Sequence, residues 1–211
     1  MFVDVNGDSV WIYEGDQRTL YSVGMTTTKN MSKFVAGVVN ALNKLNKVKG
    51  AGSEVVDALV KSESNYNYRA GDKSRTEGVD GKAGADIYLK TTTFDDVTHE
   101  TFHGYQSQMG TGGQTYFAEV EAYAYNYLID KALKLPTTSR FGQDNNSGMG
   151  FQQEMERFVE NLDDVSHGEA ARGFQSGSVW NMKGEYNDPS YTPFDRNSQN
   201  IIRALFMKGR K

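Results

Sequence analysis

The sequence contains no cysteine and only 3 prolines among its 211 residues. Without thiols the chain can form neither a disulfide framework nor a thiolate metal site, so any bound zinc must take nitrogen and oxygen ligands. A cysteine nucleophile is excluded for the same reason. Because the fold does not depend on disulfides, redox conditions do not indicate a compartment, and the localisation stays open.

Long apolar runs and a strong positive charge are also missing. No stretch of about eighteen consecutive apolar residues occurs, and the first residues lack the basic segment and apolar core of a signal peptide. We therefore expect neither a membrane span nor a signal peptide. The formal net charge of -4 gives no general attraction to phosphate backbones. Nucleic acid is not an expected partner.

What the sequence does contain is a series of short elements typical of an α+β domain. The 22 glycines provide many turns between these elements. Alternating apolar residues predict an N-terminal β-hairpin from residues 2–5 and 10–13, with a third short strand at 19–23. We expect residues 1–30 to be an appendage of a domain that spans residues 31–211.

The middle of the chain changes from the period of a strand to that of a helix and back. From Ser32, apolar residues recur at intervals of three and four until Gly50, which predicts an amphipathic helix. A shorter helix is expected at 53–61, and strands are expected at 65–69 and 85–90. The polar stretch 71–84 has no apolar period and is predicted to be a loop.

Two further helices are predicted after these strands. Thr93 and Asp96 have the spacing of a capping pair, so a helix should begin here and continue to about Gln108. After a glycine cluster, a long aromatic helix is expected over about 115–135, and Pro136 stops it.

The first of these helices carries the sequence HETFH, from His99 to His103. Residues four apart lie on one helical face, so these two imidazoles can bind one ion without distorting the backbone. Glu100 projects beside such an ion, where its carboxylate can take a proton from a bound water. Zinc lowers the pKa of that water to about 7. The pattern predicts zinc held by His99 and His103, with Glu100 as general base.

A catalytic zinc usually takes three protein ligands, and the third candidate here is Glu121, Glu119 or His167. Glu121 falls in the apolar stripe of the helix at 115–135, where an uncompensated carboxylate is costly, and this favours it. Glu119 lies on a more polar face and could support the ligands or be solvated. His167, in a loop, could instead donate to the oxyanion of a tetrahedral intermediate. Three tyrosines compete for that donor role: Tyr123, Tyr125 and Tyr127.

Two segments resemble the gluzincin branch of zinc metallopeptidases, HETFHGYQ and, after a glycine-containing linker, EVEAYAYNYL. More narrowly, the pattern is similar to zincin domains at the C-terminal ends of bacterial polymorphic toxins and Rhs-type effectors. The segment FVAGVVNALNKLNK also resembles what precedes such domains. The close similarity covers about residues 85–130.

The resemblance implies a zincin-like fold, in which a small, mostly antiparallel sheet packs on the active-site helix and on a following helix with the third ligand. It implies that His99, His103 and Glu121 bind the metal and that Glu100 is the base. The strand at 85–90 would form the upper edge of the cleft, where an extended peptide could add as a strand. The narrower resemblance implies an exported bacterial effector. It also implies that the substrate is a protein and that an immunity or inhibitor protein is a partner.

The leading hypothesis is therefore an endopeptidase that cleaves a protein or peptide substrate with zinc-activated water. The main alternative is a non-enzymatic interaction module, with a structural metal or none. In that case His99 and His103 form a polar helix face paired with neighbouring acids. A third possibility is metal-dependent hydrolysis of another bond, such as deacetylation.

Overall fold

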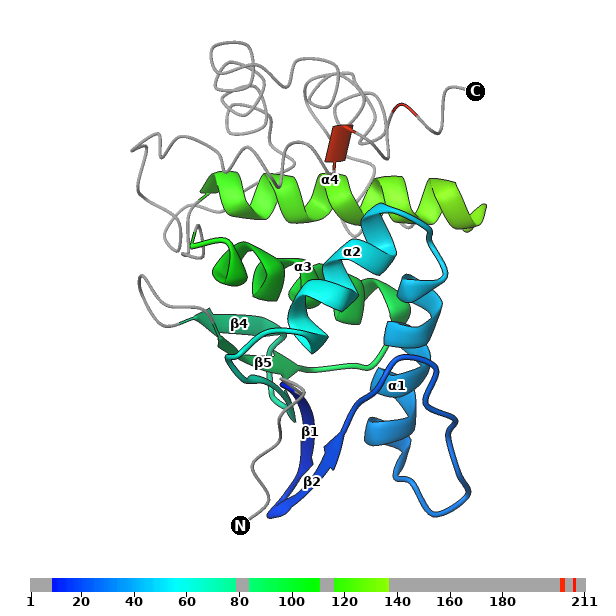
Figure 1. The fold of residues 1–211 in the computed structure, drawn as a ribbon, viewed down its shortest axis with the longest axis vertical. Coiled ribbons are helices and arrows are strands. Elements are labelled where there is room, and N and C mark those ends of the chain that lie inside the picture. The colour runs from blue at the N-terminus through cyan, green and yellow to red at the C-terminus, as the bar shows by residue number, and fades with distance from the viewer. Residues whose placement is uncertain (1–8, 79–83, 111–115, 137–201, 204–206, 208–211) are drawn as a thin grey trace. The chain divides into compact units, whose positions relative to one another are not determined.

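The computed structural model describes residues 9–78, 84–110, 116–136, 202–203 and 207 (Figure 1). The chain divides into two compact units, Met1–Gly113 and Gln114–Lys211. The strands are β1 (Val10–Glu14), β2 (Gln17–Leu20), β3 (Tyr66–Ala70), β4 (Arg75–Gly78) and β5 (Ala85–Leu89). The helices are α1 (Lys33–Asn46), α2 (Ala51–Val60), α3 (Phe94–Gln108) and α4 (Tyr116–Leu133). Among the described helices, none is long and apolar enough to cross a membrane.

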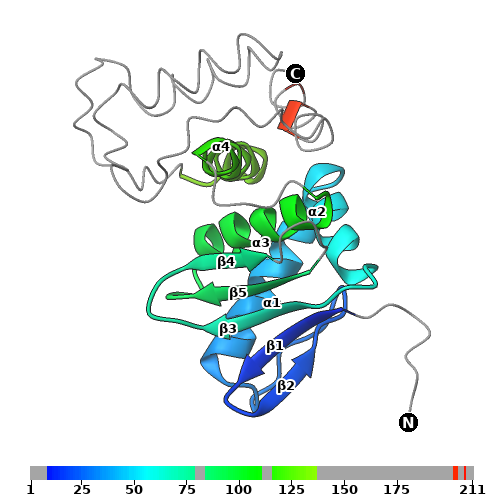
Figure 2. The same cartoon turned by 90° about the vertical axis from the view of Figure 1, so that its left-hand side faces the viewer.

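The first unit is built on one five-stranded sheet with the order β2-β1-β3-β5-β4 (Figure 2). β1 pairs with β2, and β4 with β5, in antiparallel orientation. β1 and β3, and β3 and β5, pair in parallel orientation. The α+β class is confirmed, but the sheet is mixed, whereas a mostly antiparallel sheet was predicted. The parallel pair β1–β3 is possible because α1 and α2 lie in the long connection between these strands.

The N-terminal hairpin is part of this sheet. Its strands are β1 and β2, which join at a turn where Gly15 has a φ of 58°. β1 also pairs with β3, so the segment expected as an appendage contributes an interior strand. The strand predicted at 2–5 lies outside the described residues.

The stretch 71–84 was predicted to be a loop, and this was wrong for its middle part, which forms β4. β4 has the sequence RTEG, and none of its residues is buried. An edge strand without an apolar face lacks the alternation by which strands are recognised. The strand predicted at 85–90 is β5, but it lies between β3 and β4 and is not an edge. Among the described strands, β4 forms the edge of the sheet on this side.

The core of the first unit lies between one face of the sheet and its helices. Strands β1, β3 and β5 each alternate between buried and half-buried side chains. The buried set on these strands is Val10, Ile12, Tyr66, Tyr68, Ala85, Ile87 and Leu89. α3 lies close to this face because Gly104 has no side chain there. A Cβ atom at Gly104 would lie 3.2 Å from Cδ1 of Ile87.

The helices α1 and α3 begin where the sequence indicates, and Thr93 is the cap that was predicted for α3. The side chain of Ser32 accepts a hydrogen bond from the amide of Val35 at the start of α1. Thr93 caps α3 in the same way, by accepting from the amide of Asp96. The predicted long aromatic helix is also present, as α4.

Candidate metal centre

The start of α3 is fixed by a reciprocal contact between Thr93 and Asp96. The hydroxyl of Thr93 accepts from the Asp96 amide at 3.3 Å and donates to the Asp96 carboxylate at 3.1 Å. The hydroxyl of Thr91 donates to the same carboxylate. The acid also lies where the positive end of the helix dipole favours it. This cap sets the first turn, and His99 follows on the next one.

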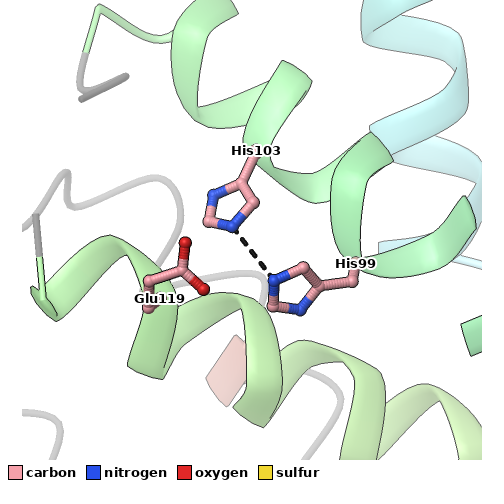
Figure 3. Close-up of side chains that lie close together, drawn as sticks. All are labelled: His99, His103 and Glu119. Carbon is pink, nitrogen blue, oxygen red and sulfur yellow. Dashed lines mark hydrogen bonds between the residues drawn. The ribbon is translucent and has the colours of Figure 1, made fainter. Parts of the chain in front are cut away.

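His99 and His103 project from the same face of α3 and meet at their Nε2 atoms, which lie 3.1 Å apart (Figure 3). The ring centroids are 4.7 Å apart and the rings are nearly perpendicular, at 84°. His99 is only 3% exposed, and His103 is half-buried. Two nitrogens bound to one tetrahedral zinc at the usual 2.0–2.1 Å are about 3.3 Å apart. The pair therefore has the spacing of two ligands of one ion.

Gln106 determines which nitrogen of His103 can bind a metal. Its Oε1 atom lies 2.8 Å from Nδ1 of His103. An amide oxygen only accepts, so Nδ1 carries the proton and Nε2 keeps its lone pair. That lone pair is on the side of the ring that faces His99. In metal-binding histidines, the hydrogen bond made by the nitrogen that does not bind the metal typically orients the ring in this way.

Glu100 is 4% exposed and is held from the sheet. The hydroxyl of Thr76, on β4, donates to Oε2 of Glu100 at 2.9 Å. The same hydroxyl lies 3.1 Å from the backbone carbonyl oxygen of Glu100. The residue predicted to be the base is thus attached to the edge strand as well as to α3.

The glutamates predicted as third ligands lie on α4. Glu121 is 3% exposed, which confirms the burial expected from its place in the apolar stripe. Glu119 is half-buried. His99 and His103 belong to the first unit and both glutamates to the second, so the role of either glutamate as the third ligand stays a prediction.

The remaining predicted residues are not assigned by this geometry. His167 lies outside the described residues, so its role as an oxyanion donor or ligand stays a prediction. Of the competing tyrosines, Tyr125 is fully buried and Tyr127 nearly so, while Tyr123 is half-buried. These positions suit core packing for the first two.

Two residues of the site were missed by the sequence analysis, Gln106 and Thr76. Gln106 follows His103 by three residues, so its place on the same helical face was a signal that could have been used. Thr76 gave no comparable signal, because it lies in a stretch without any period and is 24 residues from Glu100.

Comparison with protein-family models, with curated proteins and with solved structures finds no match for this chain.

Proposed function

We propose that this protein is a zinc-dependent hydrolase that cleaves peptide bonds in a protein substrate. The observation that supports it most is the pair of Nε2 atoms of His99 and His103, 3.1 Å apart on one helical face. Gln106 fixes the tautomer that points the lone pair of His103 into this space. A pair of surface histidines would need neither the burial of His99 nor this orientation.

The third ligand in this proposal is a glutamate of α4. The sequence favours Glu121, which is buried, and Glu119, which is half-buried, is the alternative. Two imidazoles and one carboxylate form a ligand set typical of catalytic zinc and leave one position for water.

In the proposed reaction Glu100 moves the proton. A bound zinc ion would supply a water with a pKa near 7 and would polarise the scissile carbonyl. The carboxylate of Glu100 accepts a proton from the attacking water and delivers it to the leaving amine, because the amine leaves readily only when protonated. His99 and His103 keep their positions throughout, since the cap of α3 and Gln106 hold them.

The substrate proposal follows from the edge of the sheet. Within the described residues β4 pairs on one side only, with β5, so an extended peptide could pair along its other side. The proposal therefore gives β4 the role in peptide pairing that the resemblance gave to the strand at 85–90. The zincin-like fold, the role as an exported bacterial effector and the immunity protein rest on the resemblance alone and stay predictions.

A single conservative substitution tests the reaction. Glu100→Gln keeps the size of the side chain but cannot act as a base, so it should retain zinc and lose activity by at least about 100-fold. Glu54→Gln, at an exposed position in the first turn of α2, is the matched control and should retain activity. Cleavage of casein and of a random peptide mixture would be measured through newly formed amino termini. Full activity of Glu100→Gln would refute the assignment.

Metal analysis separates the hydrolase from an interaction module. Protein purified without chelator should contain about one zinc per chain, and EDTA should abolish cleavage until zinc is restored. A chain without stoichiometric zinc, whose stability does not change with EDTA, belongs to the alternative class.

A further inference from the structure

The edge strand β4 supplies one hydroxyl to the predicted base. Among the described residues, Thr76 is the one side chain that donates a hydrogen bond to the carboxylate of Glu100, at 2.9 Å. We propose that Thr76 is a positioning residue for Glu100, which sets the direction in which its carboxylate points. This inference rests on the proposed function, because it assigns Thr76 a part in the same reaction.

The geometry ties the carboxylate to the backbone of its own helix. The Thr76 hydroxyl lies within reach of two oxygens of Glu100, Oε2 at 2.9 Å and the backbone carbonyl oxygen at 3.1 Å. The carbonyl oxygen cannot move relative to α3, since it belongs to the helix. A hydroxyl located beside that fixed oxygen therefore holds Oε2 at a fixed place as well.

A glutamate needs such a contact if it is to transfer protons. Its side chain has three rotatable bonds, and an unheld carboxylate samples several rotamers. Proton transfer requires the oxygen to lie within hydrogen-bond reach of the water, and a displacement of about 1 Å can cost about 100-fold in rate. Glu100 is also 4% exposed, so water is a poor substitute for the lost donor.

The strand that carries Thr76 is itself held in register. Thr76 is paired with Ile87 of β5, whose side chain is buried beneath α3. Gly78, at the end of β4, permits a close approach to α3, because a Cβ atom there would lie 2.9 Å from Oγ of Ser107. The neighbouring Arg75 packs over the Tyr88 ring at 4.1 Å. Thr76 is thus a fixed point and can position a flexible side chain.

The test compares Thr76→Val and Thr76→Ala with Thr76→Ser in the full chain loaded with zinc. Valine keeps the branched shape and the strand preference but has no hydroxyl, whereas serine keeps the hydroxyl. We expect both variants without a hydroxyl to lose about tenfold or more in kcat, with KM within about twofold of the wild type. Thr76→Ser should recover most of the rate. Thr19→Val, on the opposite edge strand β2, is the matched control and should behave as the wild type.

Zinc content and thermal unfolding are measured on every variant, so that a loss of metal or fold is recognised. Thr76→Val or Thr76→Ala with normal zinc, normal stability and a kcat within twofold of the wild type overturns the role of Thr76 and leaves the hydrolase intact. Equal losses in Thr76→Ser and Thr76→Val also overturn it, because the hydroxyl would then be irrelevant. If the zinc-loaded wild type cleaves neither casein nor the peptide mixture, the hydrolase proposal is refuted. The role of Thr76 is then refuted as well.

Discussion

The Nδ1 atom of His103 lies 2.8 Å from Oε1 of Gln106, which is one helical turn further along α3. This contact assigns the proton to Nδ1 and leaves Nε2, on the opposite side of the ring, as the nitrogen that can bind a metal. The affinity for zinc should therefore depend on a residue that does not itself touch the ion.

Gln106→Leu is expected to weaken zinc binding by about 10- to 100-fold, because the orienting acceptor is lost. Gln106→Glu keeps an acceptor of the same size and should bind zinc at least as tightly as the wild type. Gln17→Leu, at an exposed position of β2, controls for the loss of an amide elsewhere. Competition with a fluorescent zinc chelator measures the affinities of the wild type and of the three variants. Gln106→Leu with wild-type affinity would show that the contact has no influence on the metal.

The third ligand can be identified by the same measurement on two variants of α4. Glu119→Gln should lower the affinity for zinc by about 100-fold if Glu119 completes the site, since a neutral amide is a much poorer ligand. Glu121→Gln should then change stability more than affinity, because Glu121 is 3% exposed and the substitution changes the charge and hydrogen bonding of a buried group. The reverse result, with zinc lost in Glu121→Gln and retained in Glu119→Gln, would support the assignment of Glu121 made from the sequence.

The parts of the fold that the sequence predicted are those with a strong local signal. The helices α1 and α3 begin at Ser32 and Thr93 because each cap satisfies a backbone amide that the helix cannot. β4 had no such signal, since its three polar residues and one glycine alternate in neither burial nor character. β4 exists because it pairs with β5. Pairing between two separate segments cannot be predicted from the sequence of either segment alone.

The residues of the candidate site also divide into those with a local sequence signal and those without one. The spacing of His99 and His103 is local to one helix, so the sequence was sufficient to place both on one face. The burial of Glu121 was also predictable, because it follows from the apolar stripe of α4. Metal ligation, however, depends on distances between different elements. The period of apolar residues within one helix gives no information about those distances. The contact of Thr76 with Glu100 joins a strand to a helix and could not be predicted for that reason.

The side chain of Tyr68, on β3, is fully buried and contacts α3 through Thr101. Burial raises the pKa of Tyr68 above its ordinary value of 10.0, and its hydroxyl lies 2.8 Å from Oγ1 of Thr101. Burial also raises the pKa of Tyr21 and of Tyr66. Above about pH 10 the unfolded chain loses these protons while the folded chain keeps them, so the unfolded state binds fewer protons. The free energy of unfolding should therefore be unaffected by these groups below that pH and should fall as the pH rises beyond it.

Tyr68→Phe removes one of the three groups, so its free energy of unfolding should fall less steeply above about pH 10 than that of the wild type. At neutral pH the variant should be less stable by about 1 kcal/mol, because the hydrogen bond with Thr101 is lost. Urea unfolding at a series of pH values from about 8 to 11 measures both effects, and lysine titration contributes equally to the two proteins. Parallel curves for wild type and variant over that range would mean that the Tyr68 phenol ionises as readily in the folded chain as in the unfolded one.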